Sequence, residues 1–218
     1  LFYDAGPAVP GFDSGARIVL PSLRYLGVRQ LDLLLLSHAD RDHTGGAQAV
    51  LDALPVKALV SGEPGQLPAR WAVQPCPVRQ WHWNAVRFSQ WQLAAGEGNS
   101  ASCVLLIEAD GERLLLTGDM DSMAEQQWLK AHPGIRVDWL LAPHHGSRTS
   151  SSPAFVAATR PRHVLMARGR YNPFGHPHAE VLARYREADA KVHDTALQGA
   201  IRIELGAQRP ALHWPPRG

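Results

Sequence analysis

The segment from residue 37 to residue 46, Ser-His-Ala-Asp-Arg-Asp-His-Thr-Gly-Gly, constrains the fold more than any other part of this sequence. It follows an apolar run at residues 31–36 that only Asp32 interrupts, and it precedes a helical pattern at residues 47–54 that stops at Pro55. A short apolar run that ends in polar residues is typical of a fully buried strand, and proline ends a helix. The sequence therefore predicts a tight connection from a buried strand to a helix.

Four side chains of the kind that bind metals lie in this connection, namely His38, Asp40, Asp42 and His43. Two carboxylates in one turn repel each other unless a cation neutralises them. Histidine and aspartate beside a Gly-Gly pair, which allows close approach of the backbone, are ligands for a hard or borderline metal. The alternative is a solvated loop with one aspartate as a helix cap, but capping accounts for one carboxylate and neither histidine. We therefore predict a metal site here.

Strands and helices alternate along the rest of the 218 residues. Buried strands are predicted at 101–109, 137–142 and 163–167, and helices at 121–131, 150–159 and 179–188. This alternation favours a layered α/β fold with helices on both outer faces. We expect one domain over residues 1–206 and a Pro-rich tail over residues 207–218. Because the chain opens within a predicted strand at residues 1–3, we expect it to be a domain of a longer protein.

Composition excludes little. The formal net charge of +2 neither favours nor excludes a nucleic-acid partner. Cys76 and Cys103 permit one disulfide, which leaves the redox compartment open. No apolar run in these residues reaches the length of a membrane span, and none has the form of a signal peptide. Trp81, Trp83 and Trp91 lie in an alternating, sheet-like segment, where contacts within a sheet are favoured over a platform for stacked bases.

Further metal-type side chains follow other predicted strands. They are Asp119, the pair His144 and His145, and the pair His176 and His178. Strand ends converge at one edge of a layered sheet, where α/β proteins build their sites. Each group alone has a structural alternative, such as a helix cap for Asp119 or a surface pair for the histidines. Together with the first turn they favour a metal hydrolase site with one or two ions.

These motifs resemble those of the metallo-β-lactamase superfamily. Its hallmark, His-x-His-x-Asp-His, corresponds here to residues 38–43, and Thr-Gly-Asp at 117–119 resembles its bridging carboxylate. Ala-Pro-His-His-Gly at 142–146 resembles its last ligand motif, and Asp4 resembles an early aspartate that supports the ligands. The resemblance implies a four-layer αββα sandwich that binds zinc or manganese. It also implies that the family's opening strands are missing before Leu1.

This sequence departs from the family pattern at two positions. The second histidine of the hallmark is Asp40, and Asn99 lies near the place of a third histidine. The resemblance then leaves His38 with Asp40 and Asn99 at one site, whereas Asp42, His43, Asp119 and His145 form the other. Carboxylate and amide ligands shift the metal preference from zinc toward Mn²⁺ or Mg²⁺. We expect one firm and one weak site, with His145 as the ligand and His144 as a neighbouring catalytic or supporting group.

A more specific set of motifs is similar to the C-terminal domain of ComEC-type DNA-uptake channels. The set comprises Ser-His-x-Asp-x-Asp-His, Asn-x-x-Ser, Thr-Gly-Asp, Pro-His-His-Gly-Ser and, at residues 175–178, Gly-His-Pro-His. This resemblance implies a nuclease that degrades one strand of incoming DNA during natural transformation. The implied partners are DNA and the rest of a channel protein in the cytoplasmic membrane, with this domain on the extracytoplasmic side. We expect the fragment itself to be a soluble monomer.

For such a reaction the predicted catalytic residues are Asp42, His144 and His178. Either histidine could protonate the leaving oxygen, because imidazole titrates near the working pH. Asp121 either orients one of these histidines or caps its helix. Ser147 and Arg148 are candidates for binding phosphate.

Arg168 and Arg170 either follow a DNA backbone or belong to a solvated face. The competing functions are a hydrolase of small phosphodiesters or lactones and a degenerate domain that only binds DNA.

Overall fold

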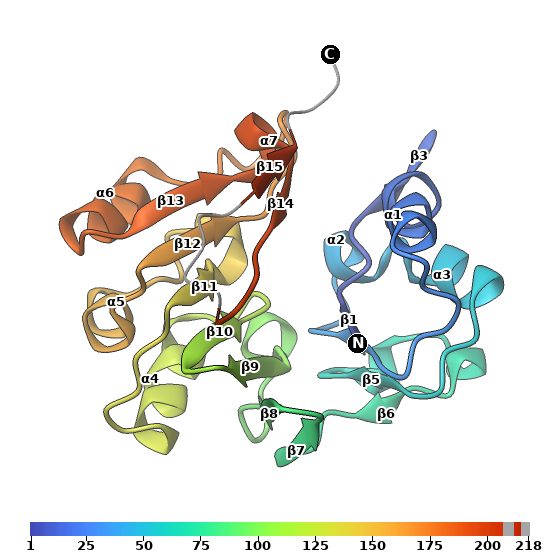
Figure 1. The fold of residues 1–218 in the computed structure, drawn as a ribbon, viewed down its shortest axis with the longest axis horizontal. Coiled ribbons are helices and arrows are strands. Elements are labelled where there is room, and N and C mark those ends of the chain that lie inside the picture. The colour runs from blue at the N-terminus through green and yellow to red at the C-terminus, as the bar shows by residue number, and fades with distance from the viewer. Residues whose placement is uncertain (207–211, 215–218) are drawn as a thin grey trace.

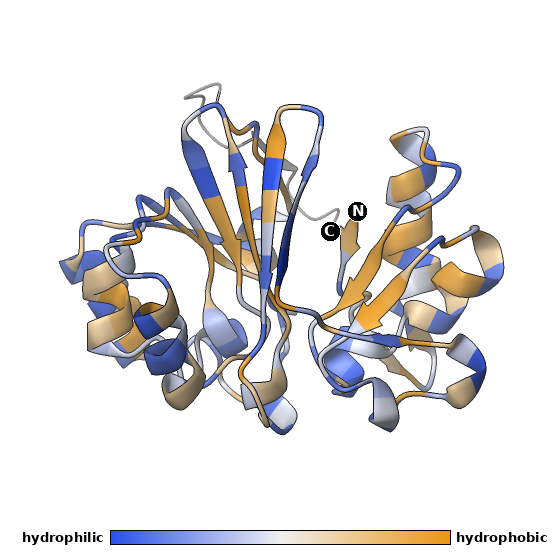
Figure 2. Ribbon diagram, turned by 90° about the horizontal axis from the view of Figure 1, so that it is seen from below, coloured by the Kyte–Doolittle hydropathy of each residue, from blue (hydrophilic) through white to orange (hydrophobic). Residues whose placement is uncertain are grey.

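The computed structural model of the protein describes residues 1–206 and the backbone of residues 212–214. Two β-sheets lie face to face, and helices cover the outer face of each (Figure 1). The view in Figure 2 shows the same four layers from below, with apolar residues in the strands between the helices. This arrangement confirms the predicted αββα sandwich.

The N-terminal half forms a four-stranded parallel sheet in the order β1-β4-β5-β6. Its strands are β1 (Phe2–Tyr3), β4 (Leu34–Leu36), β5 (Leu59–Ser61) and β6 (Gln74–Pro75). The three leucines of β4 are completely buried, as expected for a strand covered on both faces. The strand is shorter than the apolar run at 31–36, but it delivers the polar turn to the edge of the sheet as predicted.

Helical segments cover the outer face of this sheet. A π-helical turn at Gly15–Val19 continues into α1 (Leu20–Tyr25), and α3 (Ala47–Ala53) packs beside them. Leu23 of α1 and Val50 of α3 are buried in one core cluster with Leu34 and Leu36 of β4. The helix predicted at 47–54 is therefore confirmed, and it ends one residue earlier than predicted.

The second sheet has seven strands in the order β13-β12-β11-β10-β9-β8-β7. Neighbouring strands from β7 to β10 are antiparallel, whereas those from β10 to β13 are parallel. The strands are β7 (Arg79–Trp83), β8 (Val86–Trp91), β9 (Val104–Ala109), β10 (Glu112–Leu116), β11 (Trp139–Leu141), β12 (His163–Met166) and β13 (Lys191–Asp194). The strands predicted at 101–109, 137–142 and 163–167 are present as β9, β11 and β12, and the sheet-like segment with Trp81 and Trp91 forms β7 and β8.

Three helices cover the outer face of the second sheet, namely α4 (Ser122–Ala131), α5 (Pro153–Thr159) and α6 (Ala179–Glu187). Their buried side chains form one core cluster with the sheet, in which Trp128 and Tyr185 are the largest. This cluster is larger than those of the N-terminal half. It gives the C-terminal half a rigid base for the site.

Several segments between the predicted strands and helices contain short regular elements. Residues 7–15 hold a hairpin of β2 (Ala8–Val9) and β3 (Phe12–Asp13), which a left-handed Gly11 allows. The remaining short elements are η2 (Pro64–Gln66), η3 (Ala69–Trp71), η4 (Gly98–Ala101), η5 (Pro143–Gly146) and α7 (Thr195–Gln198). These elements are rich in proline and glycine, and each spans only one turn or one strand pair. Elements that short show no hydrophobic periodicity in the sequence.

At the C-terminal end, β14 (Ala200–Arg202) pairs antiparallel with the backbone of β15 (Leu212–Trp214). The other residues of the predicted tail, 207–211 and 215–218, lie outside the described residues. Within the described residues, no helix combines the length and the apolar character that crossing a membrane requires.

A disulfide joins the two halves of the sandwich. Cys76, directly after β6, bonds to Cys103, directly before β9, with a Cα–Cα distance of 5.9 Å. Tyr3 Oη also donates a hydrogen bond of 2.8 Å to the carbonyl of Cys103. The disulfide that the two cysteines permitted is therefore formed, and it links the two sheets close to their edge.

Trp81 and Trp83 of β7 pack within the second sheet. The ring of Trp81 stacks on Phe88 with a centroid distance of 5.1 Å, and Trp83 meets the same ring edge-on. These contacts support the prediction of sheet packing.

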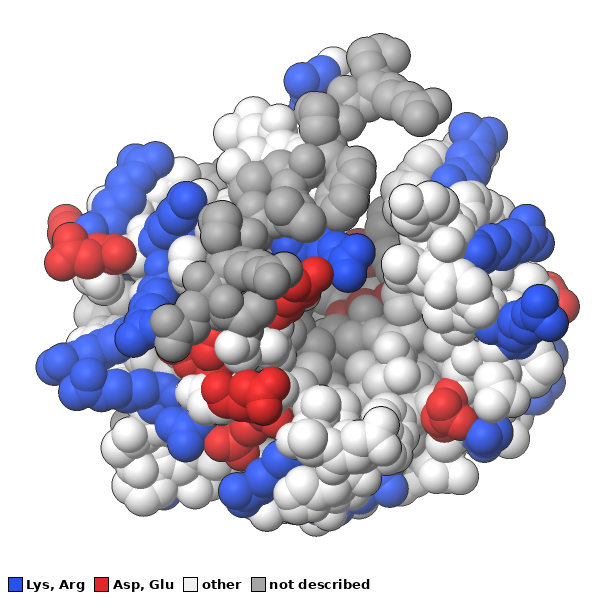
Figure 3. Space-filling view, viewed as in Figure 1, with Lys and Arg blue, Asp and Glu red and all other residues white. Residues whose placement is uncertain are grey.

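On the face shown in Figure 3, lysine and arginine side chains lie along both outer edges of the molecule, and several acidic side chains lie nearer its centre.

Candidate metal centre

The polar turn after β4 folds tightly around its glycines. Asp40 has an extended backbone and α2 (Arg41–Thr44) follows it, so the chain reverses within a few residues. A Cβ at Gly46 would overlap the carbonyl oxygen of Ala5, so the turn has no room for a side chain at this position. His43 is thereby buried against the first strand, and its exposed fraction is 4%.

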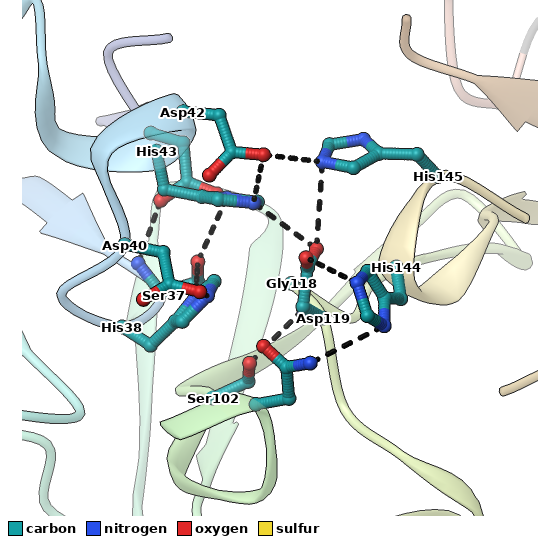
Figure 4. A network of polar contacts seen from close by, with 12 residues as sticks. Ser37, His38, Asp40, Asp42, His43, Ser102, Gly118, Asp119, His144 and His145 are labelled. Carbon is teal, nitrogen blue, oxygen red and sulfur yellow. Dashed lines mark hydrogen bonds and ion pairs between the residues drawn. The ribbon is translucent and has the colours of Figure 1, made fainter. Parts of the chain in front are cut away.

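Four predicted ligands converge in one cluster, shown in Figure 4. His43 Nε2 lies 3.1 Å from Asp119 Oδ1, and His145 Nε2 lies 3.4 Å from Asp42 Oδ2. The ligating atoms of all four residues lie within 4.8 Å of one another. Asp42 and His43 come from the turn after β4, Asp119 from the end of β10, and His145 from the turn after β11. The ends of strands from both sheets therefore build the cluster.

Two atoms of the cluster are buried without a hydrogen-bond partner among the described residues, His43 Nε2 and Asp119 Oδ1. Burying such an atom unsatisfied costs about 1–3 kcal/mol, so an arrangement of this kind needs an explanation. Two imidazole nitrogens and two carboxylates form a donor set that suits Zn²⁺ or Mn²⁺. The residues present therefore fit a divalent cation.

The histidines of the cluster are oriented by acceptors on their far side. Asp4 Oδ2 accepts a hydrogen bond of 2.8 Å from His43 Nδ1, and the carbonyl of Ala167 accepts one of 2.7 Å from His145 Nδ1. Each bond leaves Nε2 facing the cluster as a possible ligand. Asp4 in turn accepts a hydrogen bond of 2.6 Å from the backbone N–H of Ser37, which holds its carboxylate in place.

Charges within the cluster shift the pKa values of its side chains. Burial lowers the pKa of His43, but the neighbouring Asp4 and Asp119 outweigh burial and raise that pKa well above its ordinary value. Burial raises the pKa of Asp119, but His43 and the other histidines outweigh it and lower that pKa. Without a cation, a proton on His43 therefore compensates the carboxylates. Binding a metal requires the loss of that proton, so metal affinity depends on pH.

The second histidine pair lies on a strained backbone. His144, His145 and Gly146 have consecutive positive φ angles of 50°, 54° and 85°. Residues other than glycine adopt this left-handed conformation at a cost, and such strain clusters at functional sites. The turn directs His145 toward Asp42 and brings His144 Nε2 within 3.6 Å of Asp119 Oδ2.

The residues of the predicted weak site are not part of the four-residue cluster. His38 Nε2 lies 3.4 Å from Asp40 Oδ2 and makes no hydrogen bond in the described part of the protein. Asn99 instead donates through Nδ2 to His144 Nδ1 at 3.3 Å. The ring of His38 lies 4.4 Å from that of His43, so this group adjoins the cluster. A second ion here stays a prediction.

Other predicted site residues lie farther from the cluster. Asp121 caps α4 by accepting from the N–H of Ala124 at 2.9 Å, and it also accepts from Ser100 Oγ at 2.7 Å. It therefore has the capping position that the sequence left as one of two alternatives. The ring of His178 lies 5.1 Å from that of His176, and it is His176 whose ring lies 5.5 Å from His144.

The two predicted phosphate contacts differ in exposure, because Arg148 is exposed and Ser147 is buried. Arg148, whose side chain is 70% exposed, forms an ion pair of 3.0 Å with Glu180. Ser147 Oγ lies 3.2 Å from Thr149 Oγ1. Arg168 contacts Asp194 at 2.7 Å and is mostly buried, whereas Arg170 is exposed.

Three further residues hold the site in position, although no role was predicted for them from the sequence. Ser37 Oγ lies 3.0 Å from His38 Nδ1 and 3.2 Å from His43 Nδ1, and Ser102 Oγ accepts from the N–H of Asp119 at 3.0 Å. Glu63 accepts from the backbone N–H groups of Ala39 and Gly98 at 3.0 and 2.9 Å. It thereby ties the turns of the two halves together. Its place just after β5 is the signal that could have identified it.

Sequence relatives of the chain include a competence protein and a recombination protein. It is 35% identical over 210 residues to Competence protein ComA of Neisseria gonorrhoeae, covering 94% of this chain and 29% of that protein. It is 32% identical over 212 residues to Recombination protein 2 of Haemophilus influenzae, covering 96% and 26%. It is 30% identical over 207 residues to ComE operon protein 3 of Bacillus subtilis, covering 88% and 27%. The chain thus spans less than a third of the length of these relatives.

Solved structures share the fold at low sequence identity. A protein from Parabacteroides distasonis superposes with a TM-score of 0.53 and 14% identity, covering 78% of each chain. CmlA, a diiron β-hydroxylase from Streptomyces venezuelae, has a TM-score of 0.52 and 14% identity, covering 85% of this chain and 45% of that one. The sequence profile of the metallo-β-lactamase superfamily matches residues 4–170. With this match and the converging His and Asp side chains, the chain belongs to the metallo-β-lactamase superfamily.

Proposed function

We propose that this protein is a metal-dependent nuclease that cleaves DNA phosphodiester bonds and degrades one strand during DNA uptake. The observation that carries the proposal is the cluster in which His43 Nε2 and Asp119 Oδ1 are buried without a hydrogen-bond partner among the described residues, because a bound cation would satisfy both atoms. Similarity to competence proteins over most of the chain supports DNA as the substrate.

The four residues of the cluster would hold the cation, Mn²⁺ or Zn²⁺. A divalent cation bound there supplies a Lewis acid that lowers the pKa of water and stabilises charge on the phosphate. Asp42 is the half-exposed member of the cluster, since 47% of its side chain is exposed. It is therefore placed to orient a water molecule that enters from solvent. His43 and Asp119 stay covered, and they hold their positions through Asp4 and Ser102.

His144 is placed to move a proton at the leaving oxygen. Its Nδ1 is occupied by Asn99 and lies 3.1 Å from Thr149 Oγ1, so Nε2 is the nitrogen that faces the cluster. General acid catalysis needs such a group within hydrogen-bond reach of the leaving oxygen. The ring of His178 contacts the ring of His176, which in turn contacts His144. We therefore assign His178 a supporting role through His176.

The exposure of the cluster favours a polymeric substrate. Asp42 and His145 have side chains that are 47% and 24% exposed, so the centre opens to solvent on one side. The exposed Arg148 and Arg170 are suited to contact successive phosphates, whereas Ser147 is buried. A hydrolase of small molecules encloses its substrate in a pocket, which this open side does not favour.

The parent protein is proposed to be a DNA-uptake protein of the cytoplasmic membrane, with this domain on the extracytoplasmic side. The chain covers 26–29% of the length of the relatives, which leaves room in them for a channel. The Cys76–Cys103 disulfide supports an oxidising compartment, because disulfides persist outside the cytosol and are rare within it.

Metal analysis followed by DNA digestion tests the proposal. The purified protein is expected to bind about one equivalent of divalent metal per chain, as a four-ligand site of this kind holds one ion, and to digest single-stranded DNA with Mn²⁺. The double variant Asp42→Ala, His43→Ala should lose both. Digestion that survives in the double variant would be due to contamination. Metal binding and DNA binding without digestion would identify the degenerate, non-catalytic domain instead.

A further inference from the structure

The turn at residues 171–176, between β12 and α6, exposes aromatic rings close to the metal centre. Tyr171 is 91% exposed and Phe174 is 69% exposed. Exposing large apolar rings costs free energy, and exposed apolar residues that gather at one place mark interaction sites. The mechanism proposed above for the nuclease gives these two rings no role.

The turn holds Phe174 in a defined position. Asn172 bridges its two ends, because Nδ2 donates to the carbonyl of His176 at 2.8 Å and Oδ1 accepts from the N–H of His176 at 2.9 Å. Phe174 lies between these two residues, at the tip of the turn. A ring that is held in place can bind a partner with a smaller loss of conformational entropy.

The exposed ring is connected to the metal centre by a series of ring contacts. Phe174 stacks on His176 with a centroid distance of 5.8 Å and an interplanar angle of 28°. His176 meets His144 edge-on at 5.5 Å, and His144 Nε2 lies 3.6 Å from Asp119 Oδ2. A base stacked at Phe174 would therefore lie at one end of a series of contacts whose other end is the metal centre.

The turn is also fixed to the strained segment of the site. The N–H of His178 donates to the carbonyl of Gly146 at 3.0 Å. Pro177 packs so closely that a Cβ at Gly146 would lie 2.5 Å from the Cβ of Pro177. The distance from Phe174 to the metal centre is thus set by packed backbone.

Positive charge adjoins the turn. A pocket of about 570 Å³ is lined by His176 together with Arg168, Arg170 and Arg186. Arg168 is paired with Asp194. Arg170 and Arg186 are exposed and form no ion pair within the described residues, so their guanidinium groups are available to an anion such as a phosphate.

Resting on the nuclease function, we propose that this turn is a base-stacking platform that selects an unpaired DNA strand. Phe174 and Tyr171 stack bases, while Arg170 and Arg186 contact the phosphates between them. Aromatic rings beside basic side chains are the combination that binds single strands without sequence preference. A duplex keeps its bases stacked on one another, so it offers no free base face to Phe174.

The test measures binding separately from cleavage. Fluorescence anisotropy with chelator present compares a labelled oligothymidylate of about 12 nucleotides, within the site sizes of such proteins, with a duplex of equal length. Phe174→Ala should raise the Kd for the single strand about five- to 100-fold and change the Kd for the duplex far less. Phe174→Trp should retain the affinity. Tyr25→Ala is the matched control, because Tyr25 is 88% exposed on α1.

Two further probes distinguish stacking from other contacts. An abasic strand of the same length should bind wild-type protein at least as weakly as oligothymidylate binds Phe174→Ala, because the base at Tyr171 is lost as well. With the abasic strand, Phe174→Ala and the wild-type protein should have the same Kd. Phe174→Leu keeps an apolar side chain without a π-face, so it should bind like Phe174→Ala. Full affinity in Phe174→Leu, as expected of a membrane or protein contact, would overturn the platform.

The two proposals fail separately. If the wild-type protein prefers single strands and Phe174→Ala loses that preference, but no strand is cut with Mn²⁺, then the platform stands and the nuclease is wrong. If DNA is cut while wild-type protein and Phe174→Ala bind single strands equally well, then the platform is wrong and the nuclease stands.

Discussion

His43 Nε2 and Asp119 Oδ1 lie 3.1 Å apart although they belong to different halves of the sandwich. His43 follows β4 of the four-stranded sheet, and Asp119 follows β10 of the seven-stranded sheet. A cation between them would therefore hold the two sheets together as well as activate a substrate.

Metal binding should accordingly stabilise the fold. A cation at 100 times its Kd that binds only the folded state adds about 2.7 kcal/mol to the free energy of unfolding. We expect the midpoint of thermal unfolding to rise with added Mn²⁺ or Zn²⁺ in wild-type protein but not in His43→Ala. His82→Ala removes an exposed histidine of β7 and should respond like the wild type. A metal-dependent rise in His43→Ala would place the ion elsewhere.

Asp4 should control metal affinity without being a ligand. Its carboxylate orients His43, and loss of such a partner lowers metal affinity about 10- to 100-fold. Calorimetric titration of Asp4→Asn should show this weaker binding at unchanged stoichiometry. Asp52→Asn, at an exposed position of α3, is the matched control and should bind metal normally. Unchanged affinity in Asp4→Asn would remove Asp4 from the site.

The disulfide between the sheets should contribute to stability. Cys76 and Cys103 are 27 residues apart in sequence, and a bridge of this kind typically contributes about 2–4 kcal/mol. Chemical denaturation of the reduced protein, and of the double variant Cys76→Ser, Cys103→Ser, should show that loss. Because a reductant leaves the double variant unchanged, the variant also controls for side effects of the reductant. Equal stability with and without the bridge would contradict this expectation.

Gly146 should be irreplaceable at the strained turn. Its φ of 85° alone makes an L-residue unfavourable, and a Cβ would also meet Pro177 at 2.5 Å. Gly134 has a φ of 72°, and a Cβ added there would have no neighbour within 4 Å. A substitution at Gly134 therefore measures the cost of the left-handed backbone alone. Gly134→Ala should cost about 1–2 kcal/mol. Gly146→Ala should cost more and also weaken metal binding, because it displaces His145; equal costs would show that the contact with Pro177 can relax.

Buried Glu125 should make stability depend on pH. Burial raises its pKa above the ordinary value of 4.5, although the N–H groups of Ser151 and Ser152 oppose the shift. The folded state therefore binds the proton more tightly than the unfolded state does. Stability from this group is fully present below pH 4.5 and is lost as the pH rises through the pKa of the folded state.

The difference in unfolding free energy between wild-type protein and Glu125→Gln measures this dependence. As the pH rises above 4.5, the wild type should lose stability relative to the variant until the carboxyl is fully ionised in the folded state. Glu187→Gln, at an exposed position of α6, should show no such trend. A constant difference between the wild type and Glu125→Gln across that range would mean that the carboxyl titrates normally.

Much of the fold followed from local patterns. The strand at 31–36, the strand at 101–109 and the helix at 121–131 were all predicted, because each depends on residues close together in the chain. The short hairpin at 7–15 was not, since two-residue strands have no periodicity to detect. The resemblance to a family supplied the sandwich, which periodicity alone left as a layered α/β fold.

The sequence by itself determined the chemistry available at the strand ends: imidazoles and carboxylates after buried strands, with glycines that allow a tight turn. Only the tertiary structure decided which atoms meet. It put His176 rather than His178 beside His144, turned Asn99 toward His144, joined Cys76 to Cys103, and brought Glu63 to both halves. The physical reason is that strand and helix preferences act within a few residues, whereas these contacts depend on how two separately formed sheets pack against each other.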